Sequence, residues 1–283
     1  MMKKKNSVLI KKKIKSFNKN LTVESDKSIS HRSLLIASQC IGISRINNLL
    51  ESEDVKNTVN CLKQLNVKII KKNKTYYVYG NGLGSFEKPK NNRLYAGNSG
   101  TLARMLFPLI GTQGNLRIKI IGDNSLNKRD MKRIIEPLSK IGCEFFPKNK
   151  TTLPLIIQGT DMPLAQKHHE KIGSAQVKSA ILLSALNTPG ITEIKVEKNS
   201  RDHTENLLKT INADIKVKNL KKGQLIYLKG QKNLLGFDLS VPGDPSSVAP
   251  FIVLALMTPN SKLMIKNVNC NKTRLGFIKI LKK

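Results

Sequence analysis

The chain has 283 residues, of which 39% are hydrophobic and 5% aromatic, with no Trp and a formal net charge of +31. This length can bury one large core or two ordinary ones, and the scarcity of aromatics argues against a base-stacking surface for nucleic acid. Most of the basic residues are lysines scattered through every segment, which is typical of a solvated basic surface and not of a nucleic-acid-binding stripe.

Cysteine spacing and hydropathy exclude further classes. Cys40, Cys61, Cys143 and Cys270 form no Cys-x-x-Cys pair, so neither a zinc site nor a disulfide framework is indicated. The Lys-rich start carries only residues 8–10 as an apolar core, well short of a signal peptide, and no segment reaches the length of a membrane span. We therefore expect a cytoplasmic protein with reduced thiols, no membrane contact, no metal and no cofactor.

Four similar motifs recur along the chain, each placing Gly, Ser or Asp directly before an apolar run. They open at Asp26, Gly97, Gly173 and Gly243, at intervals of 71, 76 and 70 residues. The first amides of a helix lack internal acceptors and the helix dipole adds about half a positive charge there, so such starts bind anions. One copy is more often an ordinary cap, but four copies at one period predict a repeated unit with its function at the helix starts.

Hydrophobic periodicity predicts the same order of elements in each unit. In unit one the apolar run 34–37 is followed by a helix with Val55, Val59, Leu62 and Leu65 on one face and by strands at 67–70 and 76–79. Unit two has helices at 97–110 and 131–141 and strands at 116–121, 143–146 and 155–158. Unit three has the apolar run 180–186, a strand through Ile194, a helix at 204–211 and strands at 215–217 and 225–228. With the strand before each motif this is βαβαββ, so we predict an α/β fold with the helix starts gathered at one end.

The fourth unit is shorter than the others. Its apolar run 249–257 precedes a strand at 262–265 and a helix from Thr273, and the sequence stops where earlier units continue into strands. We expect a polypeptide that is cut short. The fragment should expose an apolar face made of Phe251, Leu254, Leu263, Phe277, Ile278 and Leu281.

Six motifs in order resemble those of 5-enolpyruvylshikimate-3-phosphate synthase, and the resemblance covers residues 26–283. They are Asp26-Lys27-Ser28-Ile29-Ser30-His31-Arg32, Gly97-Asn98-Ser99-Gly100-Thr101, Gly122-Asp123 through Arg129, Ser174-Ala175-Gln176-Val177-Lys178, Arg201-Asp202-His203-Thr204-Glu205 and Asn271-Lys272-Thr273-Arg274. The fourth and fifth are similar to the bacterial second class of the enzyme. That family transfers the enolpyruvyl group of phosphoenolpyruvate to the 5-hydroxyl of shikimate 3-phosphate and releases phosphate.

The resemblance implies the enolpyruvyl transferase fold, in which two domains of three βαβαββ units each close on the substrates. Residues 21–239 would form the complete first domain. Residues 1–20 and 240–283 would form part of the second domain, which would be incomplete. A monomer is expected, with the two small-molecule substrates and no nucleic acid as its partners. The chain alone is expected to be inactive.

The resemblance also implies a set of site residues. Shikimate 3-phosphate would be held by Lys27, Ser28, Arg32, Ser174, Ala175, Gln176 and Arg201. Phosphoenolpyruvate would be held by Lys27, Asn98, Gly100, Thr101 and Arg129. Lys27 would also be catalytic, because an ammonium beside the reacting carbons can stabilise charge as a tetrahedral intermediate forms and collapses. The substrates bring phosphates and carboxylates, which cations and helix-start amides must offset.

Three details qualify that assignment. Asp130 stands where the family has a proline, which would place an anion beside Arg129. The family's Asp and Glu acid/base groups would lie beyond this sequence. Glyphosate binds in the phosphoenolpyruvate site of this family, and Gly100 has no methyl group to crowd it, so sensitivity is expected.

Two alternative functions stay open. The UDP-N-acetylglucosamine enolpyruvyl transferase shares the fold class but uses a Cys in a mobile loop and opens with a Lys-Asn motif, and neither is found here. A basic nucleic-acid-binding protein is the alternative from another class. His31 and His203 are expected to be structural, and His168 and His169 to form an exposed loop pair without a metal.

Overall fold

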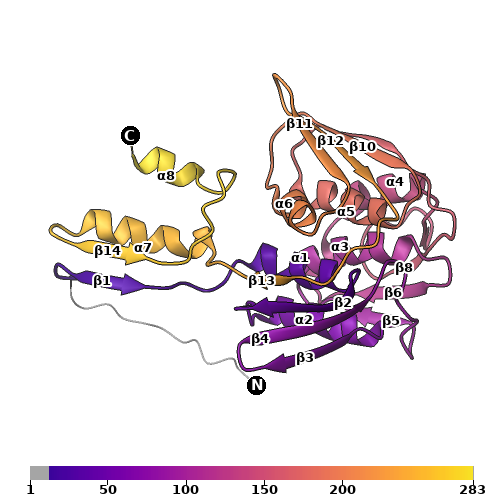
Figure 1. The fold of residues 1–283 in the computed structure, drawn as a ribbon, viewed down its shortest axis with the longest axis horizontal. Coiled ribbons are helices and arrows are strands. Elements are labelled where there is room, and N and C mark those ends of the chain that lie inside the picture. Colours follow the sequence, from indigo (N-terminus) through magenta and orange to yellow (C-terminus); the bar gives the residue numbers. More distant parts are fainter. Residues whose placement is uncertain (1–12, 283) are drawn as a thin grey trace.

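Three repeats build the larger of two bodies in the computed structural model, which describes residues 13–282 (Figure 1). Unit one comprises α1 (Lys27–Ala37), β2 (Ile41–Asn47), α2 (Glu53–Gln64), β3 (Lys68–Lys72) and β4 (Thr75–Asn81). Unit two comprises β5 (Arg93–Tyr95), α3 (Gly100–Gly111), β6 (Arg117–Ile121), the short η1 (Leu126–Lys128), α4 (Lys132–Lys140), β7 (Glu144–Phe146) and β8 (Leu155–Gln158). Unit three comprises β9 (Lys167–Glu170), α5 (Ala175–Leu186), β10 (Ile191–Val196), α6 (His203–Thr210), β11 (Ile215–Asn219) and β12 (Gln224–Lys229).

Each unit has one four-stranded mixed sheet. The strand orders are β5-β6-β8-β7 in unit two and β11-β12-β10-β9 in unit three, and the first strand of each unit, β5 or β9, runs parallel to its neighbour. In unit one that place is taken by β13 (Asp238–Ser240), which follows unit three and pairs in parallel with β2. The strand that precedes α1 in the sequence, β1 (Asn18–Leu21), instead pairs in parallel with β14 (Lys262–Ile265) in the smaller body.

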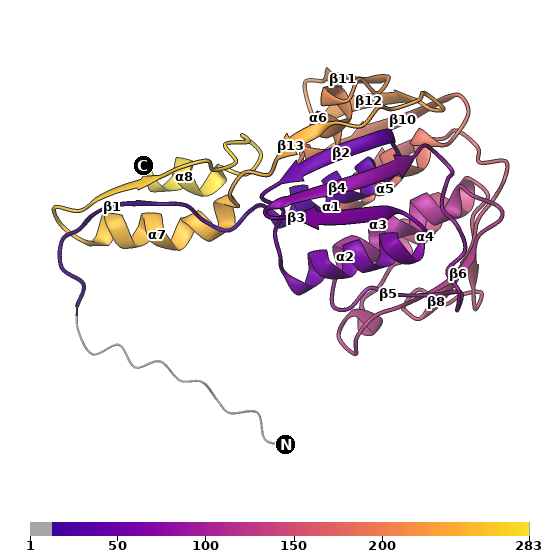
Figure 2. The same cartoon turned by 60° about the horizontal axis from the view of Figure 1, so that its bottom comes forward.

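These two strand exchanges make the chain pass twice between the bodies, and the two passages are bonded to each other. The amide of Asp26 donates to the carbonyl of Pro242 at 2.8 Å, and the amide of Asp244 donates to the carbonyl of Glu24 at 2.8 Å. The passages form the narrow neck that joins the two bodies (Figures 1 and 2).

The centre of the larger body is made by α1, α3 and α5, which lie inside the three sheets (Figure 2). Residues 30–37 of α1 and 177–186 of α5 are all buried, which explains the apolar runs 34–37 and 180–183. The second helix of each unit packs against the first helix of the next unit: α2 contacts α3, α4 contacts α5 and α6 contacts α1. The three units are thereby joined in a ring. This cyclic packing of three like units confirms the predicted α/β fold of βαβαββ repeats.

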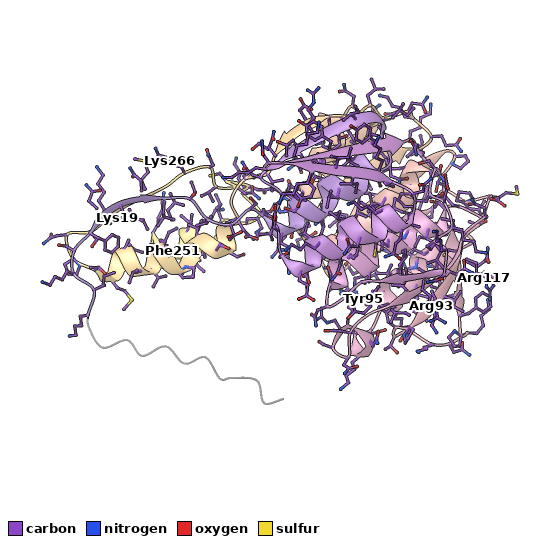
Figure 3. The ribbon with its side chains drawn as sticks, turned by 90° about the horizontal axis from the view of Figure 1, so that it is seen from below. Lys19, Arg93, Tyr95, Arg117, Phe251 and Lys266 are labelled. Atoms are coloured by element: carbon purple, nitrogen blue, oxygen red, sulfur yellow. The ribbon has the colours of Figure 1, made fainter. Side chains whose placement is uncertain are left out.

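The smaller body consists of β1, β14, α7 (Pro245–Met257) and α8 (Gly276–Leu281). Although α7 is as apolar as α3, only Pro245 and Val248 of it are buried. Phe251 is 41% exposed, and it projects from α7 in Figure 3. An apolar helix is therefore buried only where other elements cover it on several sides. Among the described residues, α7 has too few such neighbours.

The structure corrects three local predictions. Helix α3 begins at Gly100 and not at residue 97, because Ser99 caps it by accepting from the Leu102 amide at 3.2 Å. The last helix begins at Gly276 and not at Thr273, because the side chain of Asn271 accepts from the Thr273 amide at 2.8 Å and holds this stretch in a turn. His168 and His169 lie on strand β9 and not in a loop, and the His168 side chain is only 18% exposed. Residues 8–10, discussed above as an apolar core, lie outside the described residues. Every helix that the structure describes falls short of the length and apolar character that crossing a membrane requires.

Candidate functional site

The first turns of α1, α3 and α5 meet at one end of the larger body. Arg32 of α1 donates through Nη2 to Ser179 Oγ of α5 at 2.9 Å, and Gln176 of α5 donates through Nε2 to Thr101 Oγ1 of α3 at 3.1 Å. The motifs at residues 26–32, 97–101 and 173–178 are therefore neighbours, as the sequence predicted. Free helix-start amides from three units share this one face.

Each helix start is capped by the residue before it. The caps are Asp26, which accepts from the Ile29 amide at 3.0 Å; Ser99, from Leu102 at 3.2 Å; Ser174, from Val177 at 3.3 Å; and Asp244, from Ser246 at 2.8 Å. Ser174 acts here as an acceptor, so its hydroxyl proton stays available as a donor. A capping role and a ligand-binding role are thus compatible at Ser174.

Arg104, a cation at the start of α3 that is not among the expected substrate contacts, connects Gln176 with the backbone of Asp130. It lies on α3 and donates through Nη1 to Gln176 Oε1 at 3.1 Å and through Nη2 to the carbonyl of Asp130 at 3.2 Å. Burial and the neighbouring charge of Arg129 lower its pKa. A Cβ atom at Gly100 would lie 2.7 Å from Arg104 Nη1 and 3.2 Å from Arg129 Nη1, so the glycine makes room for both guanidinium groups.

Arg129 is held toward this face by Asn98. Its Nη2 donates to Asn98 Oδ1 at 2.7 Å, and Asn98 Nδ2 donates to Asp123 Oδ2 at 2.6 Å. A hydrogen bond from the Leu126 amide, and next the bond from Asn98, lower the pKa of Asp123, so that carboxylate is a stable anchor for the chain of contacts. The predicted pair of Asn98 and Arg129 is therefore in direct contact.

The carboxylate of Asp130 faces α4. Its Oδ1 accepts from the Lys132 amide at 2.9 Å, and this bond is the main cause that lowers its pKa. The negative charge of this side chain thus stabilises the positive end of the α4 helix dipole. The carbonyl of Asp130 binds Arg104 directly, and the Asp130 carboxylate partly offsets the lowering of the Arg104 pKa.

Lys27 stands at the open edge of the face. Its Nζ lies 3.0 Å from Asp54 Oδ2 of α2, and the Lys27 side chain is 49% exposed. A solvent-exposed ion pair of this kind contributes about 0–1 kcal/mol, so the ammonium can leave Asp54 for a ligand oxygen at little cost. Ser28 lies next to it, and its carbonyl accepts from Arg32 Nη1 at 3.0 Å.

Arg32 is buried beneath the site. Besides Ser28 and Ser179 it binds Thr204 Oγ1 through Nε at 2.8 Å, and the residue is 4% exposed. Burial lowers its pKa to about 10, a change that Glu205 and Asp26 partly offset, so it stays cationic at neutral pH. Arg32 joins α1, α5 and α6, and most of its donors serve the protein itself.

A buried ion pair between α5 and α6 lies near Arg32. Lys178 Nζ of α5 and Glu205 Oε1 of α6 are 2.6 Å apart, with side chains 0% and 2% exposed. The contact is a direct ion pair, although its angles fall short of a well-aligned hydrogen bond. The pair connects the Ser-Ala-Gln-Val-Lys motif with the Arg-Asp-His-Thr-Glu motif. Glu205 also provides a negative charge near the buried Arg32.

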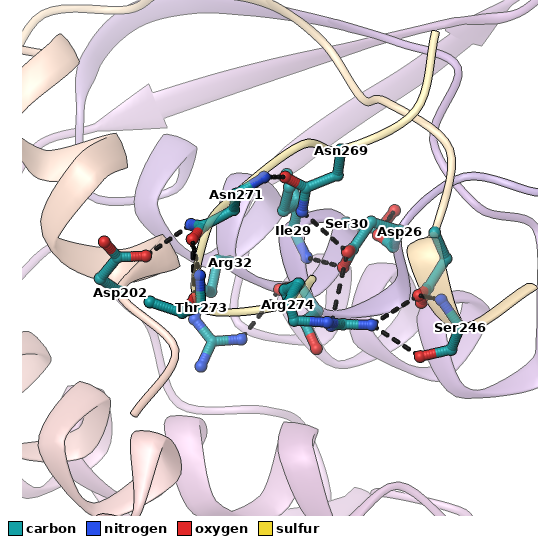
Figure 4. Close-up of polar contacts among 12 residues, drawn as sticks. Asp26, Ile29, Ser30, Arg32, Asp202, Ser246, Asn269, Asn271, Thr273 and Arg274 are labelled. Atoms are coloured by element: carbon teal, nitrogen blue, oxygen red, sulfur yellow. Dashed lines mark hydrogen bonds and ion pairs between the residues drawn. The ribbon is translucent and has the colours of Figure 1, made fainter. Parts of the chain in front are cut away.

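Arg201 and Arg274 extend the cationic face toward the neck. Arg274 donates through Nη2 to Asp244 Oδ1 at 2.6 Å and to Ser246 Oγ at 2.7 Å, and its Nη1 lies 3.6 Å from Asp26 Oδ2 (Figure 4). It therefore links the cap of α1 to the cap of α7. Partial desolvation of its guanidinium, and next the charge of Arg274, lower the pKa of Arg201, although the residue as a whole is exposed; Arg201 is a further cation near these caps.

The two histidines in the motifs, His31 and His203, are buried beside the site. Burial lowers the pKa of His31 to about 3 and that of His203 to about 4, so both are neutral at physiological pH. The His31 Nδ1 atom is hydrogen-bonded to Thr58 Oγ1 at 2.7 Å. Neither ring can serve as a proton donor near pH 7.

The comparisons with known proteins agree with this geometry. The family model described as EPSP synthase (3-phosphoshikimate 1-carboxyvinyltransferase) matches residues 11–283. The chain belongs to the EPSP synthase family. It is 44% identical over 273 residues to the 3-phosphoshikimate 1-carboxyvinyltransferase of Petrotoga mobilis, covering 94% of this chain and 61% of that protein. It is 40% identical to the enzyme of the same name from Bartonella tribocorum, covering 95% of this chain and 61% of that protein.

A solved structure gives the same result. The EPSP synthase from Acinetobacter baumannii superposes with a TM-score of 0.86 at 35% identity, covering 95% of this chain and 59% of that one. The chain thus spans about 60% of the length of these relatives.

This face suits ligands that carry several negative charges. Lys27, Arg104, Arg129 and Arg201 surround the helix starts. Positive charge alone does not mark the site, because a basic concavity of about 940 Å³ elsewhere, lined among others by Lys63, Lys88, Lys90 and Arg93, shares no residue with it. What sets the helix-start face apart is that its side chains are oriented by one another.

Sequence reasoning missed four residues that organise the site. They are Glu170, Lys178, Glu205 and Arg274. Lys178, Glu205 and Arg274 stand inside motifs that were recognised. Each of these side chains is buried against a side chain of opposite charge, and that partner is 27 to 37 residues away in the sequence. No local pattern in the sequence reveals such a pairing.

Proposed function

We propose that the face formed by the starts of α1, α3 and α5 is the substrate-binding face of a 3-phosphoshikimate 1-carboxyvinyltransferase. The reaction moves the enolpyruvyl group of phosphoenolpyruvate to the 5-hydroxyl of shikimate 3-phosphate by addition and elimination through a tetrahedral intermediate, and releases phosphate. The observation that carries the proposal is the convergence of three capped helix starts and four surrounding cations on one face.

Shikimate 3-phosphate takes the part of this face between α1 and α5. Lys27, Ser28, Arg32, Ser174, Ala175, Gln176 and Arg201 are its proposed contacts. The first amides of α5, the free proton of Ser174 and the exposed Arg201 suit a phosphate. Arg32 lies deeper, and we propose that it supports Ser28 while it offers its remaining donors to the ligand.

Phosphoenolpyruvate takes the part at the start of α3. Lys27, Asn98, Gly100, Thr101 and Arg129 are its proposed contacts. Asn98 orients Arg129, and the missing side chain of Gly100 lets a ligand reach the first amides of α3. The same space accounts for the proposed sensitivity to glyphosate.

Lys27 is the proposed catalytic residue on this face. Its exposed ammonium can exchange Asp54 for the oxygens of both substrates. A cation between them would offset their repulsion and stabilise charge that develops on the reacting carbons.

The organisation of the chain is proposed in the same way. Residues 21–239 form one complete domain, and residues 1–20 and 240–283, of which the structure describes 13–20 and 240–282, belong to a second domain. We propose a cytoplasmic monomer whose partners are its two small-molecule substrates.

Calorimetric titration of the chain with shikimate 3-phosphate alone tests the proposal. We expect saturable binding that Arg201→Ala weakens about tenfold to a hundredfold, since a hydrogen bond to a charged group contributes about 1.5–3 kcal/mol. Arg45→Ala is the matched control, because Arg45 lies in an exposed ion pair with Asp238 on β2 and β13. It should leave the affinity unchanged.

A titration with duplex DNA distinguishes the rival function. If the chain ignored shikimate 3-phosphate and bound the duplex with an affinity that falls steeply with salt, the basic surface would be the functional one. The enzyme proposal would then be wrong.

A further inference from the structure

Glu170, the last residue of β9, is a buried carboxylate that the proposed substrate contacts do not use. Its side chain is 5% exposed. Its Oε1 accepts from three consecutive amides of the loop that follows, those of Ile172 at 3.1 Å, Gly173 at 3.1 Å and Ser174 at 3.2 Å. Successive amides that point at one anion form a nest, and here the anion is part of the protein.

A cation from the neighbouring unit completes the environment of Glu170. Arg133 of α4 donates through Nη2 to the same Oε1 at 3.3 Å. His168 Nε2 lies 3.9 Å from Oε2, too far for a hydrogen bond, and burial lowers the pKa of this ring. Arg133 is thus the charge partner, and the contact ties unit three to unit two.

The loop between β9 and α5 is shaped around this carboxylate. Gly173 has a φ of +82°, and a Cβ atom there would lie 2.9 Å from the carbonyl oxygen of Lys198. Only glycine fits this backbone without strain. The loop then delivers Ser174 in extended conformation as the cap of α5.

The nest also decides which amides a ligand can use. The amides of residues 172–174 are occupied by Glu170. Those of Ala175 and Gln176, in the first turn of α5, have no acceptor within their helix. An anion that binds here is therefore directed to the first turn of α5 and to the Ser174 hydroxyl.

We propose that Glu170 is a positioning residue: an internal anion that holds the Ser174-Ala175-Gln176 helix start in its binding conformation before any ligand arrives. The inference rests on the proposed function for the identity of the ligand, shikimate 3-phosphate. Without the carboxylate, three amides lose their acceptor and the loop is less ordered in the free chain. Ordering it when the ligand binds then costs free energy, which lowers the affinity. A purely structural role would lower stability without this loss of affinity.

Amide hydrogen exchange in the ligand-free chain tests the first half of the inference. In Glu170→Ala, exchange at residues 172–174 should accelerate by about tenfold or more relative to the wild type, because a protected amide that loses its acceptor exchanges by local opening. Glu170→Gln keeps the size and one oxygen acceptor, so it should give a smaller acceleration and stays informative if the alanine variant folds poorly. The control is Glu197→Ala, which removes an exposed carboxylate paired with His169 at the end of the same sheet.

Ligand binding tests the second half. Calorimetry should show that Glu170→Ala weakens shikimate 3-phosphate binding by about tenfold, and that millimolar formate, a small carboxylate, restores both the affinity and the slow exchange in this variant only. Unchanged exchange at residues 172–174 in Glu170→Ala would overturn the inference, and so would an equal loss of affinity in Glu197→Ala. If the wild type bound no shikimate 3-phosphate while exchange still depended on Glu170, the proposed function would fail and the role of Glu170 in ordering the loop would stand.

Discussion

The buried pair of Lys178 and Glu205 makes the most demanding prediction for stability. Lys178→Met keeps the length of the apolar stem but leaves Glu205, 2% exposed, without its partner 2.6 Å away. Breaking a buried pair on one side costs about 3–5 kcal/mol. That is a large share of a typical net stability of about 5–15 kcal/mol, and it corresponds to a midpoint lower by about 6–20 °C at roughly 2–4 °C per kcal/mol.

Urea unfolding followed by circular dichroism measures this loss, and two further variants identify its cause. Adding Glu205→Gln to Lys178→Met should recover most of the stability, because no unpaired charge remains. Recovery should be incomplete, since Glu205 also compensates the buried Arg32. Lys132→Met removes an exposed pair with Glu136 and should change stability by less than about 0.5 kcal/mol. The reasoning is refuted if Lys178→Met is no more destabilising than Lys132→Met.

Three other predictions concern the ligand face and its histidines. Arg129→Ala should weaken phosphoenolpyruvate binding by about tenfold or more and leave shikimate 3-phosphate affinity within about twofold, as judged by calorimetry with each ligand; equal losses would contradict the assignment. Gly100→Ala places a methyl group 2.7 Å from Arg104 Nη1, so the Arg104 side chain must move. Glyphosate should then compete less well against phosphoenolpyruvate in a competition assay, and undiminished competition would reject the steric argument. The pKa values of His31 and His203 in the folded chain, about 3 and about 4, lie below the ordinary 6.5, so the unfolded chain binds protons at a higher pH than the folded chain does. The stability that the two rings contribute is therefore complete above about pH 6.5 and is lost as the pH falls toward the folded values. The loss amounts to at most about 1.4 kcal/mol per pH unit for each ring. Unfolding free energies across this range should show the slope, and a His31→Gln variant that retained all of it would contradict the role of that ring.

Signals that lie within a few residues allowed most elements to be predicted from the sequence, although the helix expected from residue 97 begins at Gly100. The caps at Ser99 and Ser174 are local features, since the hydroxyl accepts from an amide three residues ahead. The apolar face of α4 follows from its period, and Ile134 and Leu138 are buried as that period predicts. Helices, strands and the repeat were therefore predictable, because each is encoded in a short stretch of chain.

Pairing between distant segments was not predictable in the same way. That β13 pairs with β2 and β1 with β14 depends on where the chain crosses between the two bodies. Both strands are short, and no periodicity distinguishes one parallel neighbour from another. Only the resemblance to a known family suggested that the first strand belongs with the last segment.

The candidate site divides along the same line. The sequence by itself determined which residues stand at the starts of α1, α3 and α5, because the capping residues and motif intervals of 71 and 76 residues can be read along the chain. The tertiary structure alone decided that Arg104 binds Gln176, that Glu170 holds the loop before α5 and that Asp130 turns its carboxylate to α4. The physical reason is that a charge is oriented by whichever partners the fold brings within hydrogen-bonding distance, and at Arg104 that partner is 72 residues away.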